Sequence, residues 1–508
     1  MKSIEHKSFR GTVLGLISFL LNIVYSLMLI PVFLTFWGDE KYGYFLAIYA
    51  FVQLMRTLDT GHQIYVGNEF SKSYYQNPEK AYEILSSSIG IAFVLGFIEL
   101  LVFLVLWYVG VLDYLIGVDM KTNHLFFWGI LGMLIMWWLV GSIGGILARI
   151  ILAKGYYSES VMFAILIKFI ETIILFIAVY YNYSINSAFF LIAFATLLYS
   201  AGVFYWTAIR MPEYFPWWKN YNMRLGFKNF GKSMVLTTNG FLDQLNSNGT
   251  LFLIGKYLSA GTIPVFTTIR TLTNTMTMLT NLMIQPLIPE MIRFDSEGQK
   301  DKIWKIIEVN WFISGALISF SFLFLIPVVD MLFRIWTNGH IEFNNLLFYL
   351  LALSVVAVNF GRSMTSYLIG INDLKGISAI TYVRFLLVFG CSFLFIDKLG
   401  LLAIGLGILI SEMVCSVVLP TIFARIHLRD HQFDIFKLVV AMFPMVVLGL
   451  GMFLCYIYPE IVLPICLISG SCIAVICYWQ WNALEGEVRY RILHFIQNGF
   501  RRVPSPRV

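Results

Sequence analysis

Residues 84–107 read ILSSSIGIAFVLGFIELLVFLVLW, and Glu99 is the one charged residue in this run. A helix of about twenty apolar residues is long enough to cross the roughly 30 Å of hydrocarbon in a bilayer. Similar runs recur along the chain, in which 59% of residues are hydrophobic, 17% aromatic and 13% charged. Soluble domains carry roughly 25% charged residues. The sequence therefore predicts a protein that crosses a membrane many times.

The apolar runs also predict the kind of fold. Lipid offers no hydrogen-bond partners to the backbone, so only helix bundles and closed barrels span a bilayer, and long unbroken apolar runs exclude the barrel. We predict an all-α polytopic membrane protein with about fourteen transmembrane helices. The expected crossings lie near residues 11–37, 42–66, 84–107, 125–153, 161–181, 185–209, 230–258, 262–289, 303–329, 346–369, 377–396, 401–424, 438–458 and 461–481.

The distribution of basic residues predicts the orientation. With these crossings, the side that holds the N-terminus carries 22 Lys and Arg residues, and the opposite side carries 4. Because cytoplasmic loops are enriched in Lys and Arg, both termini are expected in the cytoplasm. This topology accounts for the net charge of +6, so nucleic acid is not an expected partner.

A polar interruption divides the chain into two sets of six crossings. The predicted organisation is an N-lobe at 1–210, a cytoplasmic linker at 211–229, a C-lobe at 230–425, two further helices at 426–482 and a basic cytoplasmic tail at 483–508. Since six is even, both lobes begin on the same side, as in a parallel repeat about the membrane normal. No loop exceeds about twenty-five residues, which leaves no room for a soluble catalytic domain, and we expect a protein that is not an enzyme.

Four short segments resemble one family of transporters. Residues 31–44, PVFLTFWGDEKYGY, are similar to the first hairpin of Wzx-type O-antigen and capsular polysaccharide flippases, which belong to the multidrug/oligosaccharidyl-lipid/polysaccharide (MOP) exporter superfamily. Leu58 to Gly61 resemble the Asp-x-Gly of that family, although the chain departs from the pattern at His62, where an apolar residue is more usual. Residues 252–259 and 398–405 resemble its turn after helix seven and its entry to helix twelve.

This resemblance implies two lobes around a central cavity that opens to one membrane face at a time. It implies a bacterial inner-membrane protein that moves an undecaprenyl-pyrophosphate-linked oligosaccharide from the cytoplasmic to the outer leaflet for O-antigen, capsule or exopolysaccharide biosynthesis. H⁺ or Na⁺ would be the coupling ion, and polysaccharide polymerase machinery a possible partner. No cofactor is implied.

A lipid-linked pyrophosphate at membrane depth requires cationic and amide groups that face a wet cavity, and ionisable residues inside crossings are the candidates. Arg270 is the strongest, because it lies in a polar stripe of residues 267–285 at spacings of three or four. The predicted substrate-binding residues are Arg270, Arg362, Arg384, Arg56, Lys168, Asn274 and Asn239. Guanidinium groups suit bidentate phosphate binding. The alternative is that these polar groups join helices without touching substrate.

Four acids inside crossings are candidates for ion coupling: Asp243, Glu412, Glu99 and Asp59. Ion pairing within a helix is a second interpretation for such acids, because Arg56 lies three residues before Asp59 and Lys168 three residues before Glu171. Residues at that spacing share a helix face and can neutralise each other. The sequence does not choose between ion coupling and simple pairing.

Two further patterns are set aside. Residues 226–233, GFKNFGKS, match the P-loop pattern, but they follow a polar linker and lead into an apolar helix, whereas a P-loop needs a preceding buried strand. His427 and His431 lie four apart without a third ligand, so we interpret them as solvated. No metal site is predicted.

Two other functions remain open. A drug or metabolite exporter of the same superfamily would share the predicted fold. A membrane glycosyltransferase, polymerase or ligase is disfavoured, because such enzymes need a substantial extracytoplasmic loop and the corresponding loops here, such as 113–123 and 330–345, are short.

Overall fold

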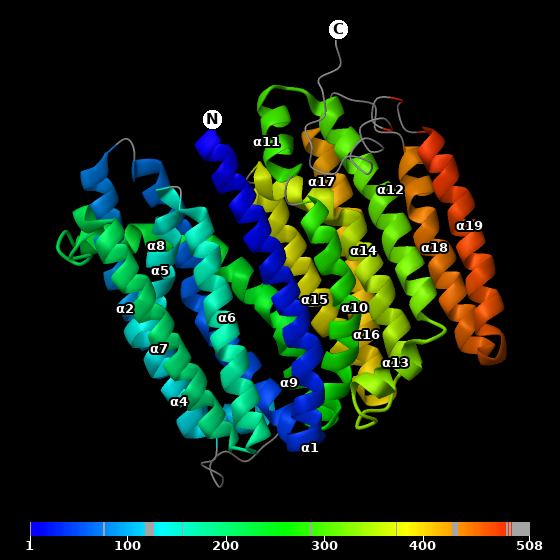
Figure 1. The fold of residues 1–508 in the computed structure, drawn as a ribbon, viewed down its shortest axis with the longest axis horizontal. Helices are drawn as coiled ribbons and strands as arrows, with labels where there is room; N and C mark the ends of the chain where they lie inside the picture. The colour runs from blue at the N-terminus through cyan, green and yellow to red at the C-terminus, as the bar shows by residue number, and fades with distance from the viewer. Residues whose placement is uncertain are drawn as a thin grey trace. The chain divides into compact units, whose positions relative to one another are not determined.

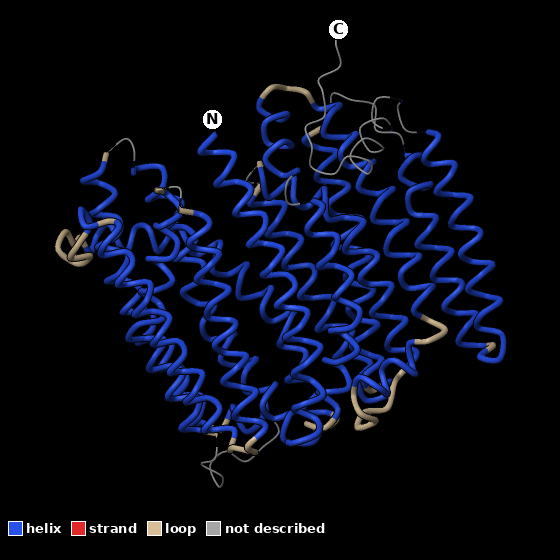
Figure 2. Tube along the Cα trace, viewed as in Figure 1, coloured by secondary structure: helices blue, strands red, loops and turns tan. Residues whose placement is uncertain are grey.

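The structure is a computed structural model that describes residues 2–74, 77–116, 126–154, 156–284, 287–371, 373–428 and 435–483, with 486 and 489. All regular elements in these ranges are helices, joined mostly by short connections (Figure 2). This confirms the predicted all-α fold class. The basic tail predicted at 483–508 lies outside the described residues apart from 483, 486 and 489.

The chain divides into two compact units. The first comprises Met1–Thr271, Phe333–Phe343 and Thr381–Ile404, and the second comprises Leu272–Leu332, Asn344–Ile380 and Gly405–Val508. Four helices have residues in both units: α10 (Thr262–Ile284), α13 (Val329–Trp336), α15 (Leu374–Leu399) and α16 (Leu401–Glu412). The lobe boundaries predicted from the sequence stay a prediction.

The first unit is built mainly from the N-terminal half of the chain. Its elements are α1 (Lys2–Tyr74), α2 (Pro78–Val109), α3 (Val111–Ile116), α4 (Phe127–Met136), the π-helical η1 (Trp137–Gly141), α5 (Ser142–Ala153), α6 (Tyr157–Tyr180), α7 (Ile185–Arg210), the short 3₁₀ turn η2 (Pro212–Tyr214), α8 (Met223–Gln244), the π-helical η3 (Leu245–Gly249) and α9 (Thr250–Tyr257).

Helix α1 contains the first two predicted crossings and is broken between them. Gly38 has φ 75° and ψ 174°, a conformation outside the helical region that is essentially restricted to glycine. Aromatic side chains surround the break, with Phe33 stacked on Tyr42 at 4.6 Å between ring centroids. The two predicted crossings are therefore separate helical segments joined at Gly38.

Helices α2, α5, α6 and α8 all pack against α1. The approach of α8 is close, because a Cβ atom at Gly61 would overlap the backbone of Thr237. Small residues allow helix backbones to approach in this way. As a result, polar residues on the inner faces of α1, α2 and α8 are brought together inside the first unit.

The second unit contains the remaining helices. Its elements are α11 (Ile288–Ser296), α12 (Lys300–Leu325), α14 (Asn345–Gly370), the π-helical η5 (Met413–Val418), α17 (Leu419–His427), α18 (Ile435–Ile457), the 3₁₀ turn η6 (Pro459–Ile461) and α19 (Val462–Ala483), together with parts of α10, α13, α15 and α16. Helices α18 and α19 form a hairpin whose two arms lie side by side (Figure 1).

Ten helices among the described residues are long and apolar enough to cross a membrane. Their positions match ten of the fourteen predicted crossings. The other four, near 11–37, 42–66, 230–258 and 262–289, lie in α1, in α8 to α9 and in α10 and are helical where described. The protein is therefore a multi-pass membrane protein.

Candidate functional site

Three of the predicted ionisable residues lie together inside the first unit. Arg56 and Asp59 lie on α1 and Glu99 lies on α2, and their exposed fractions are 8%, 0% and 2%. The three side chains interact electrostatically with one another. Charged groups at this depth are costly unless they are compensated, so their grouping is the first sign of a site.

Two residues of α6 extend this group. Glu171 interacts with both Arg56 and Lys168, and Lys168 lies one helical turn away on the same face. We call Arg56, Asp59, Glu99, Lys168 and Glu171 the charge cluster. It contains three carboxylates against two cations when all are ionised, so one bound proton or monovalent cation would neutralise it.

The π-helical segment η1 shapes one wall of the charge cluster. The Arg56 guanidinium lies over the ring of Trp137, 4.7 Å from its centroid, and Ser142 directly after η1 faces the Asp59 carboxylate. Single-turn π segments occur often at functional sites. Gly145 lets α5 approach α1, because a Cβ there would overlap the Gln63 amide.

The polar atoms of the charge cluster are not satisfied by direct hydrogen bonds. Among the described residues, both carboxylate oxygens of Asp59 and Glu99, and Nε and Nη2 of Arg56, have no hydrogen-bond partner. The same holds for the nearby donors Gln63 Nε2, Ser142 Oγ and Trp137 Nε1. Buried polar groups in native proteins nearly always have partners, including water or ions. Donors and acceptors that face one another without bonding are suited to hold water or an exchangeable ion.

The other candidates of the first unit lie on α8, α10 and α15. Arg270 on α10 is partly exposed, donates from Nη1 to the Ser247 carbonyl in η3, and lies 5.7 Å from the Phe266 ring centroid. On α8, Asn239 is buried and Asp243 is exposed, so the two do not share an environment. Arg384 on α15 is partly exposed.

Part of the polar stripe that made Arg270 a candidate is used in hydrogen bonds within α10. The hydroxyls of Thr267 and Thr271 donate to backbone carbonyls four residues earlier in the same helix, as threonines in helices often do. Those hydroxyls are satisfied locally, so the guanidinium of Arg270 carries most of the remaining capacity of the stripe to bind an anion.

The second unit holds Asn274, Arg362 and Glu412, which are each partly exposed. Glu412 precedes η5 and accepts a 2.5 Å hydrogen bond from Ser416 Oγ. Sequence reasoning missed the main polar network of this unit. Asn359 on α14 hydrogen-bonds with Thr277 and Thr280, and Asn310 on α12 donates to Ser363. Isolated asparagines within apolar runs are the sequence feature from which this network could have been predicted.

The structure also bears on the two patterns that were set aside. His427, predicted to be solvated, has its Nε2 3.1 Å from Asp373 Oδ2, because both residues lie at helix ends that meet in the second unit. His431 lies outside the described residues. Residues 226–233, with the P-loop pattern, lie inside α8, so they form a continuous helix and not a phosphate-binding loop.

No family model and no curated protein matches the chain. Solved structures do match. An inward-facing multidrug resistance MATE family transporter of the MOP superfamily is similar at TM-score 0.64 and 15% identity, over 80% of this chain and 94% of that one. The lipid II flippase MurJ in an inward closed conformation is similar at TM-score 0.66 and 13% identity, over 95% and 99%.

This chain has the fold of MOP-superfamily transporters. The Vibrio cholerae MATE transporter VcmN in its bent form agrees, with TM-score 0.56 and 15% identity over 87% of this chain and 99% of that one. At these identities the likeness establishes the fold alone. The MOP fold accommodates both transporters and a flippase, so the choice of substrate depends on other arguments.

Proposed function

We propose that the chain is a Wzx-type flippase that moves an undecaprenyl-pyrophosphate-linked oligosaccharide from the cytoplasmic to the outer leaflet. The observation that carries the proposal is the extent of the likeness to a flippase. The MurJ fold matches 95% of this chain, whereas the two MATE transporters cited above match 80% and 87%. The four short resemblances to Wzx flippases support a glycan-bearing lipid as the substrate. Such a lipid would serve O-antigen, capsule or exopolysaccharide biosynthesis in a bacterial inner membrane.

The two kinds of cation in the chain suggest two roles. Arg270, Arg362 and Arg384 retain exposure, and an exposed guanidinium can reach a pyrophosphate and bind it with two hydrogen bonds. Arg56 is 8% exposed and lies against Trp137. A side chain enclosed in this way cannot contact a large headgroup. We therefore assign the three partly exposed arginines to the substrate, and Arg56 and Lys168 to the charge cluster.

We assign ion coupling to the charge cluster. An ion can drive alternating access only if it binds one conformation better than another. The cluster offers buried carboxylates without hydrogen-bond partners among the described residues and one excess negative charge. Binding of a proton would remove that charge, and the energetic cost of burial would then differ between the loaded and empty states.

A second candidate function follows from the MATE neighbours. A small-molecule or drug exporter of the same superfamily would share the fold, the exposed arginines and the coupling site. The two functions differ in what accumulates when the protein is deleted: lipid-linked repeat units for a flippase, and a small cationic compound for an exporter.

The test is deletion of the gene in its native host, followed by extraction of undecaprenyl-linked sugars and staining of surface glycan. We expect lipid-linked repeat units to accumulate at the cytoplasmic leaflet and surface glycan to disappear. Arg270→Ala should reproduce the loss of glycan with normal insertion, whereas Arg334→Ala at an exposed position should not. Normal glycan with increased retention of a cationic dye would instead establish the exporter.

A further inference from the structure

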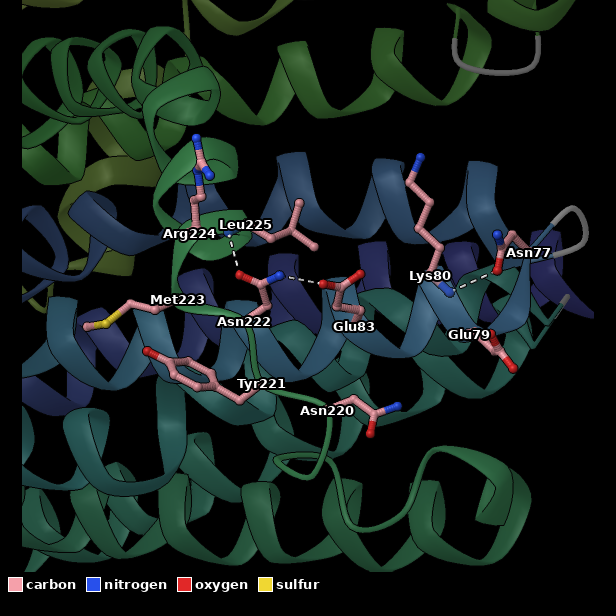
Figure 3. Close-up of a pocket in the computed structure, with 10 residues that line it drawn as sticks. All are labelled: Asn77, Glu79, Lys80, Glu83, Asn220, Tyr221, Asn222, Met223, Arg224 and Leu225. Atoms are coloured by element: carbon pink, nitrogen blue, oxygen red, sulfur yellow. Dashed lines mark hydrogen bonds between the residues drawn. The ribbon is translucent and has the colours of Figure 1, made fainter.

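An open pocket of about 1050 Å³ lies in the first unit, between the start of α2 and the segment that leads into α8 (Figure 3). Asn222 is central to it. Its Oδ1 accepts from the Leu225 amide at 3.1 Å, and its Nδ2 donates to Glu83 Oε1 at 2.6 Å. The charged lining residues are Glu79, Lys80, Glu83 and Arg224. The charge asymmetry of the sequence predicts that this pocket faces the cytoplasm.

The inner side of the pocket continues into buried polar residues of α2. The backbone N–H of Asn222 donates to Ser87 Oγ at 3.0 Å. Ser86, Ser87 and Ser88 are consecutive and have exposed fractions of 1%, 0% and 0%. Three adjacent buried serines are unusual for a lipid-facing run, since they place hydroxyls on more than one face of the helix.

Helix α8 supplies a second row of buried polar groups. Asn229, Ser233 and Thr237 follow Asn222 at spacings of seven, four and four, which places them on one helix face. Their exposed fractions are 6%, 0% and 5%. This face packs on α1 at Gly61, so the row continues from the pocket toward the middle of the first unit.

His62 on α1 lies beside both sets of buried polar residues, the serines of α2 and the row on α8. The residue is fully buried, its Nδ1 is 3.5 Å from Ser233 Oγ, and the Ser88 backbone also faces the ring. Phe230 contacts the ring edge-on at 5.9 Å between centroids. His62 is three residues from Asp59 on the same helix, a rise of about 4.5 Å. It therefore connects the polar rows to the charge cluster.

Five atoms along this route share one property, whereas the hydroxyls of Ser88 and Ser233 donate to the carbonyls of Ile84 and Phe230 in their own helices. In the described part of the chain, His62 Nε2, Gln63 Nε2, Ser86 Oγ, Asn229 Nδ2 and Thr237 Oγ1 are buried and have no hydrogen-bond partner. Buried polar atoms in such numbers are normally satisfied by internal water. We call residues Ser86, Ser87, Ser88, Asn229, Ser233, Thr237 and His62 the polar track.

We propose that the polar track is a hydrated proton pathway between the pocket at Asn222 and the Asp59–Glu99 carboxylates, with His62 as the residue that passes the proton. The inference rests on the coupling role proposed for the charge cluster and adds its route to the cytoplasm. In the transfer, the O–H bond of the protonated carboxyl breaks as an N–H bond forms on the imidazole. The imidazolium then releases a proton from its other ring nitrogen to water beside Ser233, which leaves a neutral ring and a carboxylate.

Charged groups lie on each helix that surrounds His62. On α1, Asp59 and Arg56 are three and six residues before it, and α2 carries Glu83 at the pocket and Glu99 in the charge cluster. On α8, Lys232 is exposed beside Ser233, and on α5 the Arg149 side chain packs against α1 at Gly67. A neutral imidazole between carboxylates at both ends can accept a proton from one side and release it to the other. An apolar side chain of similar size would fill the same space but could not carry a proton.

The test uses purified full-length protein in liposomes that contain the pH-sensitive dye pyranine, with a potassium gradient and valinomycin to impose a voltage. We expect His62→Gln to slow proton flux by about a hundredfold, the lower end of the range for loss of a positioned proton-transfer group. Asn229→Leu, which blocks the track without touching His62, should also slow it. His340→Gln, at an exposed histidine of the first unit, is the matched control and should conduct normally.

The outcomes separate the pathway from the coupling site. Slow flux in Asp59→Asn with Glu99→Gln, together with wild-type flux in both His62→Gln and Asn229→Leu, would overturn the pathway and leave the coupling site intact. Wild-type flux in the double carboxylate variant, or wild-type protein no faster than empty liposomes, would overturn both. Size-exclusion profiles and thermal unfolding identify any variant that has not folded. A slower flux in heavy water for wild type, absent in His62→Gln, would independently support transfer through the ring.

Discussion

Asp59 and Glu99 are buried carboxylates that this fold retains at an energetic cost. Taking a charge out of water costs several kcal/mol even after relaxation, and these oxygens recover little through hydrogen bonds to the described residues. Sites that store such cost are usually functional, and their removal often stabilises a protein while it loses activity. The charge cluster can therefore be tested by stability as well as by transport.

We expect Glu99→Gln to raise the thermal unfolding temperature of the purified protein in detergent while it abolishes coupled transport. The amide has the same shape but avoids the burial of a charge, and a gain of about 1 kcal/mol is reasonable for this kind of change. Glu460→Gln, at an exposed position, should change neither property. A clear fall in unfolding temperature for Glu99→Gln would mean that the carboxylate is structural.

Part of the site was predictable at the level of single residues. Arg56, Asp59, Glu99 and Lys168 were candidates because ionisable groups are rare inside apolar runs. What the sequence did not supply was their grouping, since α1, α2 and α6 meet only through tertiary packing. His62 was noted only as a departure from a motif. Its contact with Ser233 joins residues 171 positions apart, so no local sequence pattern could predict it.

At the scale of elements, helix positions followed from the apolar runs, but the irregular segments did not. The sequence suggested no π-helical turns, and the structure contains η1, η3 and η5. Each borders a candidate residue: Trp137 of η1 lies against Arg56, Ser247 of η3 accepts from Arg270, and Ser416 of η5 donates to Glu412. The register of a π turn is set by contacts with other helices, so composition alone cannot locate it.

The break in α1 depends on one glycine. We expect Gly38→Ala to destabilise the protein by about 1–3 kcal/mol, because an L-residue is strained at φ 75° and ψ 174°. Gly202→Ala is the matched control, since Gly202 lies within α7 and a Cβ there would contact nothing within 4 Å. In a helix interior this control should be neutral or stabilise by about 0.5–1 kcal/mol. Thermal unfolding of both variants is the measurement, and equal effects would contradict the role of Gly38.

The contact between α14 and η5 in the second unit gives a prediction of a different kind. A Cβ at Gly361 would overlap the Ser416 carbonyl oxygen, which is backbone and cannot rotate away. Gly361→Ala should therefore separate α14 from η5, lower the unfolding temperature and disturb Glu412 through Ser416. Overpacking of this kind typically costs about 1–3 kcal/mol. Gly390→Ala, inside α15 where a Cβ meets nothing within 4 Å, should be neutral or stabilise by about 0.5–1 kcal/mol, as at Gly202.

At the scale of the whole molecule, the sequence predicted fold class and number of helices well because lipid restricts the possible folds. Orientation is a separate prediction that depends on the charge asymmetry. We expect a fluorescent protein fused after residue 508 to fold and fluoresce in the cytoplasm, and alkaline phosphatase fused after His340 to be active outside it. The reverse pattern would invert the topology and move the Asn222 pocket to the outer face.

Coupling between ion and substrate is the last property of the whole molecule. If a proton on the charge cluster changes the affinity for the lipid headgroup, the headgroup must change the proton affinity by the same factor. We therefore expect the Kd for undecaprenyl pyrophosphate, measured in nanodiscs, to vary with pH beyond the change that titration of the ligand itself produces. The Asp59→Asn, Glu99→Gln double variant measures that ligand contribution, because its cluster has lost the two buried carboxylates. If the two proteins had the same pH dependence, the headgroup and the charge cluster would be energetically independent, and the cluster would not drive transport.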